Sequence, residues 1–179
     1  MILMSKSTSE HKKHVPLAVN FALITVSSSR YDQALKGETV DDETRNITMG
    51  ILSLAGKNVV YSDLVSDDFK LIKNSLKKAI DLANVDAVIT FGGTGITNTD
   101  VTIETIAPLF EKDIPGFGEL FRKLSYDEIG SAAMITRATA GLIKDKPVFC
   151  LPGSPQGVSL VLNKLILPEI GHIIKHARE

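Results

Sequence analysis

A short apolar run, Val85 to Phe91, leads directly into a glycine-rich loop, and helical spacing of apolar residues follows from about Val101 to Phe110. The loop consists of Gly92, Gly93, Thr94 and Gly95. A strand that is apolar on both faces, followed by a tight glycine turn and a helix, is typical of a parallel sheet covered by helices. This segment therefore indicates an α/β fold.

The same alternation runs along most of the chain. Pro168 should kink or restart the last helix, because proline lacks an amide hydrogen and crowds the preceding turn. Strands that alternate with helices pair in parallel through right-handed crossovers, which predicts a three-layer α/β/α sandwich around a mostly parallel sheet. The patterns predict further strands at 17–26, 59–61 and 148–151, helices at about 39–54, 69–83, 120–126 and 158–166, and no clear element at 127–143.

Length and composition narrow the class of protein. A chain of 179 residues is expected to form one domain, here residues 17–179 behind a flexible N-terminal tail of residues 1–16. A net charge of −1 provides no global field for a polyanion, so no nucleic-acid partner is expected. Uninterrupted apolar stretches stay far below the roughly 18 residues that cross a bilayer, so no membrane segment is expected.

The single cysteine, Cys150, allows neither an intrachain disulfide nor a cysteine-based zinc site, which favours the cytoplasm. It lies in an apolar strand with no histidine close in sequence, so we expect a core residue rather than a nucleophile. His172 and His176 have the i, i+4 spacing of a metal pair but no HExxH pattern, and we interpret them as part of a solvated face.

Ligands of parallel sheets bind beyond the carboxyl ends of the strands, here in the loops after Val26, Leu64, Phe91 and Leu151. The GGTG loop can adopt positive φ angles and turn its amides towards a phosphate at a helix N-terminus; the alternative is a tight turn without a ligand. Walker and dinucleotide-binding motifs are absent. Pro152, Gly153, Ser154 and Pro155 form a second loop of this kind, or alternatively a rigid turn.

Two acidic residues follow successive predicted strands. Asp67 comes after the second predicted strand and Asp100 after the third, each close to the start of a helix. Either residue alone could cap its helix. As a pair beside loops suited to phosphate, they supply the oxygen ligands that magnesium takes together with phosphate oxygens. This arrangement favours chemistry on a nucleotide.

Over residues 17–170 the chain resembles the MoaB/MogA family of molybdenum cofactor biosynthesis, and its MoaB branch most closely. The resemblance rests on ITVS at the end of the first strand, GGTG followed by Asp100-Val101-Thr102, the string IPGFGELFR at 114–122, LSY with EIG at 124–130, and CLPGS at 150–154. The order, the spacing and the long PGFGELFR string make chance agreement very improbable.

The resemblance implies a molybdopterin-binding fold and, in active members, adenylylation of molybdopterin with MgATP ahead of insertion of molybdenum or tungsten. Asp67 and Asp100 then correspond to the two aspartates that govern catalysis and metal binding. The alternative is a noncatalytic molybdopterin-binding or scaffold protein of the same pathway. Substrate contacts are implied for Ser27, Gly92, Gly93, Thr94, Gly95, Ser125, Thr136, Arg137, Pro152, Gly153 and Ser154.

Two positions, Ser28 and Phe91, depart from the family pattern. Ser28 stands where relatives often have aspartate, which removes an acidic group from the first loop. Phe91 stands where threonine usually precedes GGTG, which is expected to remove a hydroxyl beside the phosphate loop.

Family members form trimers or hexamers, so we expect a homotrimer or homohexamer that covers apolar helix faces.

Overall fold

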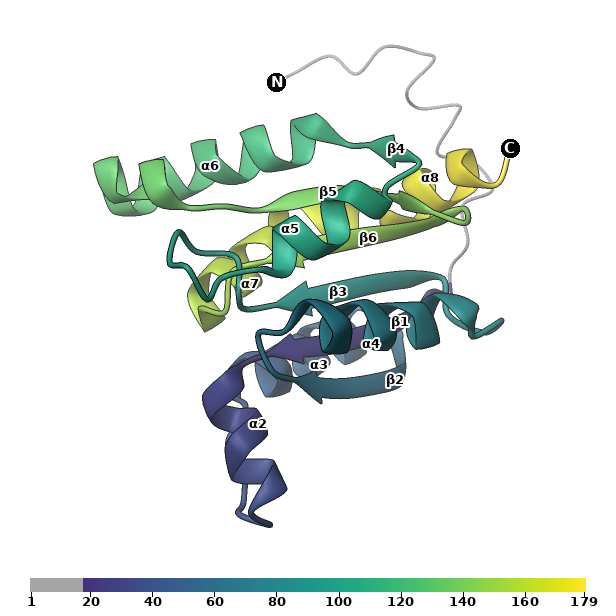
Figure 1. The fold of residues 1–179 in the computed structure, drawn as a ribbon. Coiled ribbons are helices and arrows are strands. Elements are labelled where there is room, and N and C mark those ends of the chain that lie inside the picture. The colour runs from purple at the N-terminus through teal and green to yellow at the C-terminus, as the bar shows by residue number, and fades with distance from the viewer. Residues whose placement is uncertain (1–17) are drawn as a thin grey trace.

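The computed structural model describes residues 18–179, so the expected tail at 1–16 lies outside the described residues. A six-stranded sheet has the order β2-β1-β3-β6-β5-β4 (Figure 1). Strands β2, β1, β3 and β6 pair in parallel, and β5 and β4 are antiparallel. The predicted α/β fold with a mostly parallel sheet is confirmed. The strands are β1 (Asn20–Val26), β2 (Asn58–Val65), β3 (Ala87–Phe91), β4 (Lys112–Asp113), β5 (Thr139–Ile143) and β6 (Lys146–Leu151).

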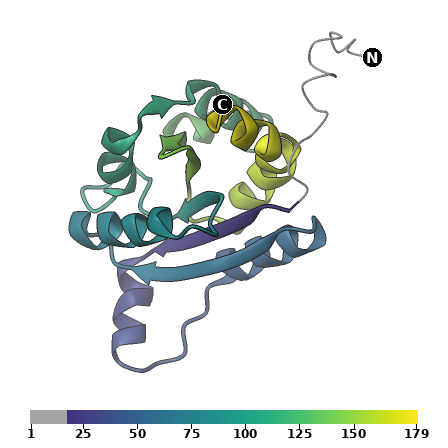
Figure 2. The same cartoon turned by 90° about the vertical axis from the view of Figure 1, so that its right-hand side faces the viewer.

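Helices cover both faces of this sheet (Figure 2). One buried cluster joins the sheet to α3, α6, α7 and α8, and a second joins it to α4 and α5. The central strands contribute to both clusters, which explains their continuous apolar runs. The helices are α2 (Ser28–Leu35), α3 (Glu43–Leu54), α4 (Phe69–Asp81), α5 (Thr102–Ile106), α6 (Pro115–Ile129), α7 (Pro155–Val161) and α8 (Leu167–Ala177), with 3₁₀ turns at Ala107–Leu109 and Gly130–Ile135 and a π-helical segment at Leu162–Ile166.

The region after β1 differs from the prediction. Helix α2 is not expected from the pattern, because most of its eight residues are polar and none of them is buried. Helix α3 begins at Glu43 rather than near Thr39. The carboxylate of Asp42 accepts a hydrogen bond from the backbone N–H of Arg45 at 3.0 Å, so Asp42 is the N-cap and not a first-turn residue.

The unassigned segment at 127–143 contains the end of α6, a 3₁₀ turn and β5. Strands β5 and β6 form a hairpin whose two-residue turn has positive φ at both Lys144 (47°) and Asp145 (61°). Such turns are usually built from asparagine and glycine, so a Lys-Asp turn gives little sequence signal. Because this hairpin runs antiparallel, the sheet is mixed rather than wholly parallel.

The last helical region changes from π-helical to α-helical geometry at Leu167, next to Pro168, and the helix is not interrupted there. The π-helical segment at Leu162–Ile166 precedes the proline, which lies in the first turn of α8. Together, Pro155–Ala177 is a 23-residue helical stretch that is long and apolar enough to cross a membrane by length and composition alone. A count of uninterrupted apolar residues does not reveal this. The side chains of Val158, Ile166 and Ile174 are buried against the sheet, and this packing accounts for the apolar composition.

Cys150 lies in the core, as expected. Desolvation by burial raises the pKa of its thiol to about 12, so almost no thiolate is present at neutral pH. We expect the native protein to show no reaction with a disulfide reagent such as DTNB at pH 8, and the urea-denatured chain to release one equivalent. Rapid reaction of the native protein would mean that β6 opens frequently.

Candidate functional site

Four loops meet at the carboxyl edge of the parallel strands, at the left of Figure 1. The backbone N–H of Ser27 after β1 donates to the carbonyl of Val65 at the end of β2, at 2.9 Å. The N–H of Gly92 after β3 donates to the carbonyl of Leu151 at the end of β6, at 3.1 Å. These bonds place the loops after β1 and β2, and those after β3 and β6, side by side.

The first two glycines of the GGTG loop have positive φ angles, 98° at Gly92 and 60° at Gly93. A Cβ on Gly92 would lie 2.2 Å from the carbonyl oxygen of Val26. A Cβ on Gly93 would lie 2.4 Å from Oγ1 of Thr102 and 2.6 Å from Oδ1 of Asp67. Glycine is therefore required at both positions by conformation and by close packing.

Asp67 lies against this loop. Its Oδ2 accepts hydrogen bonds from the backbone N–H of Ser28 at 2.9 Å and from the Ser28 hydroxyl at 2.7 Å. Its Oδ1 is the oxygen that approaches Gly93. The cap of α4 is the neighbouring Asp68, whose carboxylate accepts from Lys70 and Leu71. The alternative that Asp67 caps the helix that follows it is therefore wrong.

Asp100 lies at the other end of the same loop. Its Oδ2 accepts from the backbone N–H of Thr97 at 2.9 Å and from the Thr97 hydroxyl at 2.5 Å, and a Cβ on Gly95 would lie 2.7 Å from it. Partial burial opposes ionisation, but the bonds from Thr97 and Gly95 and the charge of Arg137 hold the pKa of this carboxyl below its ordinary value. The N-cap of α5 is Val101, so Asp100 is not a helix cap either.

A cavity of about 340 Å³ lies beside these loops, and it gathers four of the residues implied as substrate contacts. Ser125 projects from α6 and is buried, Thr136 follows the second 3₁₀ turn, and Pro152 and Ser154 follow β6. Gly153, which lies between the lining residues Pro152 and Ser154, packs against the glycine loop, since a Cβ there would lie 3.4 Å from the Cα of Gly92. Residues far apart in the sequence thus line one cavity, and the loop after β6 brings it next to the glycine loop.

Two of the implied contact residues have other partners. Arg137 does not line the cavity; its guanidinium forms an ion pair with Glu104 of α5 at 2.5 Å. Ser27 caps α2, with its hydroxyl accepting from the N–H of Arg30 at 3.4 Å. Gly153 lacks a positive φ, so the expectation that its loop needs such a conformation is wrong there.

The structure shows what surrounds Phe91 and Ser28, the two residues that depart from the family pattern. The side chain of Phe91 lies in the core and is 1% exposed, so this position faces the core rather than the phosphate loop. Ser28 contacts Asp67 directly. Because residue 91 faces the core, the prediction that Phe91 removes a hydroxyl beside the phosphate loop is wrong.

Several supporting residues were not predicted. The hydroxyl of Thr44 on α3 donates to the carbonyl of Gly153 at 2.7 Å, and the hydroxyl of Thr25 donates to buried Asp42 at 2.5 Å. These bonds fix α3 against the edge of the sheet. Phe121 and Gln156 line the cavity as well. Single polar residues on separate elements carry no local pattern, so only their spatial proximity identifies them.

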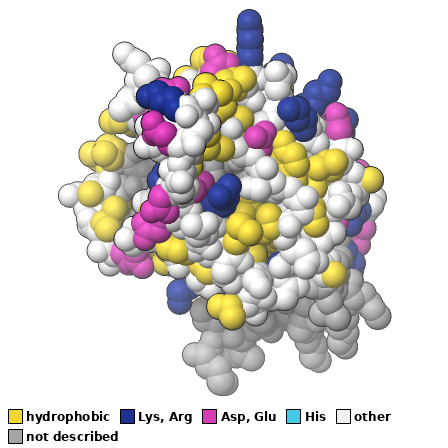
Figure 3. Space-filling model, turned by 90° about the horizontal axis from the view of Figure 1, so that it is seen from below, with side chains coloured by type: hydrophobic (Ala, Val, Ile, Leu, Met, Phe, Trp, Pro, Cys, Tyr) yellow, Lys and Arg dark blue, Asp and Glu magenta, His cyan; other side chains and the backbone are white. Residues whose placement is uncertain are grey.

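Outside this site, His172 and His176 lie on α8 with their Nε2 atoms 2.8 Å apart, and each contacts a glutamate. Within residues 18–179 no group of three or more potential metal ligands gathers. Basic and acidic side chains are interspersed on the face seen in Figure 3.

The sequence and the fold both match known proteins. Residues 22–172 match the family MoCF_biosynth, described as "Probable molybdopterin binding domain". The chain is 42% identical over 174 residues to molybdenum cofactor biosynthesis protein B of Bacillus subtilis, spanning 97% of this chain and 98% of that protein. It is 45% identical over 174 residues to molybdopterin adenylyltransferase of Pyrococcus furiosus, spanning 95% and 98%.

A crystal structure of the tungsten cofactor synthesizing protein MoaB from Pyrococcus furiosus superposes with a TM-score of 0.80 at 43% identity, covering 92% of this chain and 99% of that one. The fold, the glycine loop and these matches all indicate the same family. The chain belongs to the molybdopterin-binding family to which the MoaB and MogA proteins belong.

Proposed function

We propose that this protein binds molybdopterin and adenylylates it with MgATP in the cytoplasm, as a step in molybdenum or tungsten cofactor biosynthesis. The observation that carries the proposal is the placement of Asp67 and Asp100 at the two ends of one glycine loop, next to a cavity lined by Ser125, Thr136 and the loop after β6. A relative that is 45% identical over nearly its whole length bears the name of this activity.

In the proposed reaction an oxygen of the molybdopterin phosphate attacks the α-phosphorus of ATP, the bond from that phosphorus to the bridging oxygen breaks, and pyrophosphate leaves. The GGTG backbone binds phosphate at the loop. The cavity beside Gly153 holds the pterin, so that its phosphate lies towards the loop. This chain then acts by holding the two substrates in line, and no covalent intermediate is needed.

In the proposed reaction the two aspartates would hold a magnesium ion. Both hydrogen bonds to Asp67 go to Oδ2, which leaves Oδ1 directed at the glycine loop, and the lowered pKa of Asp100 keeps that carboxyl ionised. Carboxylate oxygens combined with phosphate oxygens are the ligands that magnesium prefers. Bound there, magnesium would offset charge on the transferred phosphate.

The decisive experiment incubates the purified protein with molybdopterin and α-labelled MgATP and follows adenylyl-molybdopterin and pyrophosphate. The proposal expects both products in equal amounts, and none when EDTA removes the metal. Molybdopterin binding by calorimetry without any product would instead support the noncatalytic binding or scaffold protein. Absence of both binding and product would contradict both readings.

Assembly is part of the proposal. Apolar side chains on α6 and the following 3₁₀ turn lie in solvent, including Tyr126 (61% exposed), Met134 (83%) and Ile135 (56%). Exposed apolar groups gathered on adjoining elements favour an interface. We expect light scattering at micromolar concentration to give a trimer or hexamer of the 19.4 kDa chain. A mass near that of one chain would contradict this prediction, and Met134→Glu should lower the mass if this surface is used.

A further inference from the structure

The first residue of α2, Ser28, contacts Asp67 with both its backbone and its side chain. The Ser28 N–H and hydroxyl donate to the same carboxylate oxygen, Oδ2, at 2.9 and 2.7 Å. Both groups are partly buried. Ser28 therefore occupies one oxygen of Asp67 with two hydrogen bonds and leaves the other unoccupied by them.

The hydroxyl of Ser28 has its proton committed to Asp67. The hydroxyl of Ser66 donates to Ser28 Oγ at 2.8 Å, and the backbone N–H of Asp67 donates to the same atom at 3.1 Å. A serine hydroxyl has one proton and two acceptor positions, so these two bonds fill its acceptor positions. The hydroxyl proton is then directed at Asp67, so Ser28 is the donor and Asp67 the acceptor in this hydrogen bond.

This arrangement sets the direction of the other carboxylate oxygen. With Oδ2 held by Ser28, Oδ1 turns towards the glycine loop, 2.6 Å from the point that a Cβ on Gly93 would occupy. Rotation of the Asp67 side chain would break both bonds to Ser28. The carboxylate therefore offers one defined oxygen to whatever binds at the loop.

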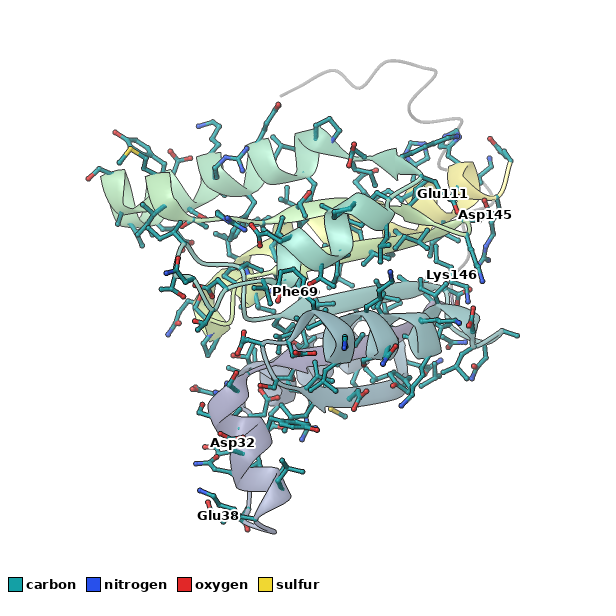
Figure 4. All side chains as sticks on the ribbon, in the orientation of Figure 1. Asp32, Glu38, Phe69, Glu111, Asp145 and Lys146 are labelled. Carbon is teal, nitrogen blue, oxygen red and sulfur yellow. The ribbon has the colours of Figure 1, made fainter. Side chains whose placement is uncertain are left out.

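Besides the contacts of Ser28, helix α2 is held by a hydrogen bond from Arg30 Nε to the carbonyl oxygen of Asp41 at 3.0 Å. It buries no residue and projects from the sheet (Figures 1 and 2), and Asp32 and Glu38 extend from it and from the segment that follows, away from the sheet (Figure 4). Ser28 joins the start of α2 to Asp67 in the loop after β2, and the N–H of the N-cap Ser27 donates to the carbonyl of Val65 at the end of β2. Ser28 thus links the start of helix α2 to Asp67.

We propose that Ser28 is a positioning residue that orients Asp67, so that Oδ1 faces the glycine loop and the metal-phosphate ligand bound there. The identity of that ligand rests on the proposed function, whereas the orientation of Asp67 does not. Partners that orient metal-binding carboxylates are typically worth 10–100-fold in metal affinity or activity.

The test compares three variants in the adenylylation assay. Ser28→Ala should lower kcat about 10–100-fold and raise the magnesium concentration needed for half-maximal rate, while the KM for molybdopterin stays within about twofold. Ser28→Thr keeps the hydroxyl and should restore most of the rate. Ser62→Ala removes an exposed hydroxyl from β2, the edge strand that leads to Asp67, and should behave as the wild type.

Each outcome has one reading. Normal kcat and magnesium dependence in folded Ser28→Ala, with an active wild type, would overturn the positioning role and leave the proposed function intact. An inactive wild type would contradict the proposed function. The crystal structure of Ser28→Ala then still decides the inference: Asp67 in a new or mixed side-chain conformation supports it, and an unchanged Asp67 overturns it.

Discussion

Asp100→Asn is expected to slow adenylyl transfer by at least about a hundredfold, the usual loss when a contact to the transition state or its metal is removed. Asparagine has nearly the same shape and keeps an oxygen that can accept from Thr97, so the loop should keep its structure. What is lost is the negative charge of the Asp100 carboxylate. Single-turnover rates at saturating MgATP measure this effect, and the melting temperature reports folding.

Asp68→Asn is the matched control for this variant. Asp68 has the same side chain at the same edge of the sheet, but it caps α4, and asparagine is as good a cap as aspartate. We expect normal turnover and nearly unchanged stability. If Asp100→Asn turned over as fast as Asp68→Asn, the Asp100 carboxylate would serve only to brace the loop, and its catalytic assignment would be wrong.

Gly93→Ala is expected to destabilise the protein by at least about 2 kcal/mol and to abolish tight ATP binding. The φ of 60° at Gly93 is costly for any residue with a Cβ, and the added carbon would lie 2.4 Å from Oγ1 of Thr102 and 2.6 Å from Oδ1 of Asp67. For a chain of this length the melting temperature should fall by about 4–8 °C. Differential scanning calorimetry and ATP titration measure the two effects.

Gly50→Ala makes the same chemical change in the middle of α3, where a Cβ would meet nothing within 4 Å. There alanine should stabilise the helix by about 0.5–1 kcal/mol, so the two variants are expected to shift the melting temperature in opposite directions. A Gly93→Ala protein as stable as the wild type, with unchanged ATP affinity, would show that the loop adapts and that this glycine is dispensable.

Local patterns were sufficient for the parallel part of the fold. Buried strands such as β1 and β3 and amphipathic helices such as α4 carry their periodicity in a short window, because burial repeats with the geometry of the element. Helix α2 is short and mostly polar and buries none of its residues, and the hairpin turn consists of Lys144 and Asp145, so neither segment contains the apolar run that marks an element. Those elements were missed or left unassigned for this reason.

In the candidate site too, some features follow from local sequence and others only from tertiary packing. By itself the sequence determined the α/β class, because the periodicity of strands and helices runs along the chain, and it singled out the glycine loops and the two aspartates as candidates from residue type and order within each loop. Only the tertiary structure decided that Asp67 is held by Ser28, that Arg137 pairs with Glu104, and that Ser125 and Thr136 share a cavity with the loop after β6. These contacts join residues distant in the chain, and the packing of separate elements, rather than any local spacing, brings them together.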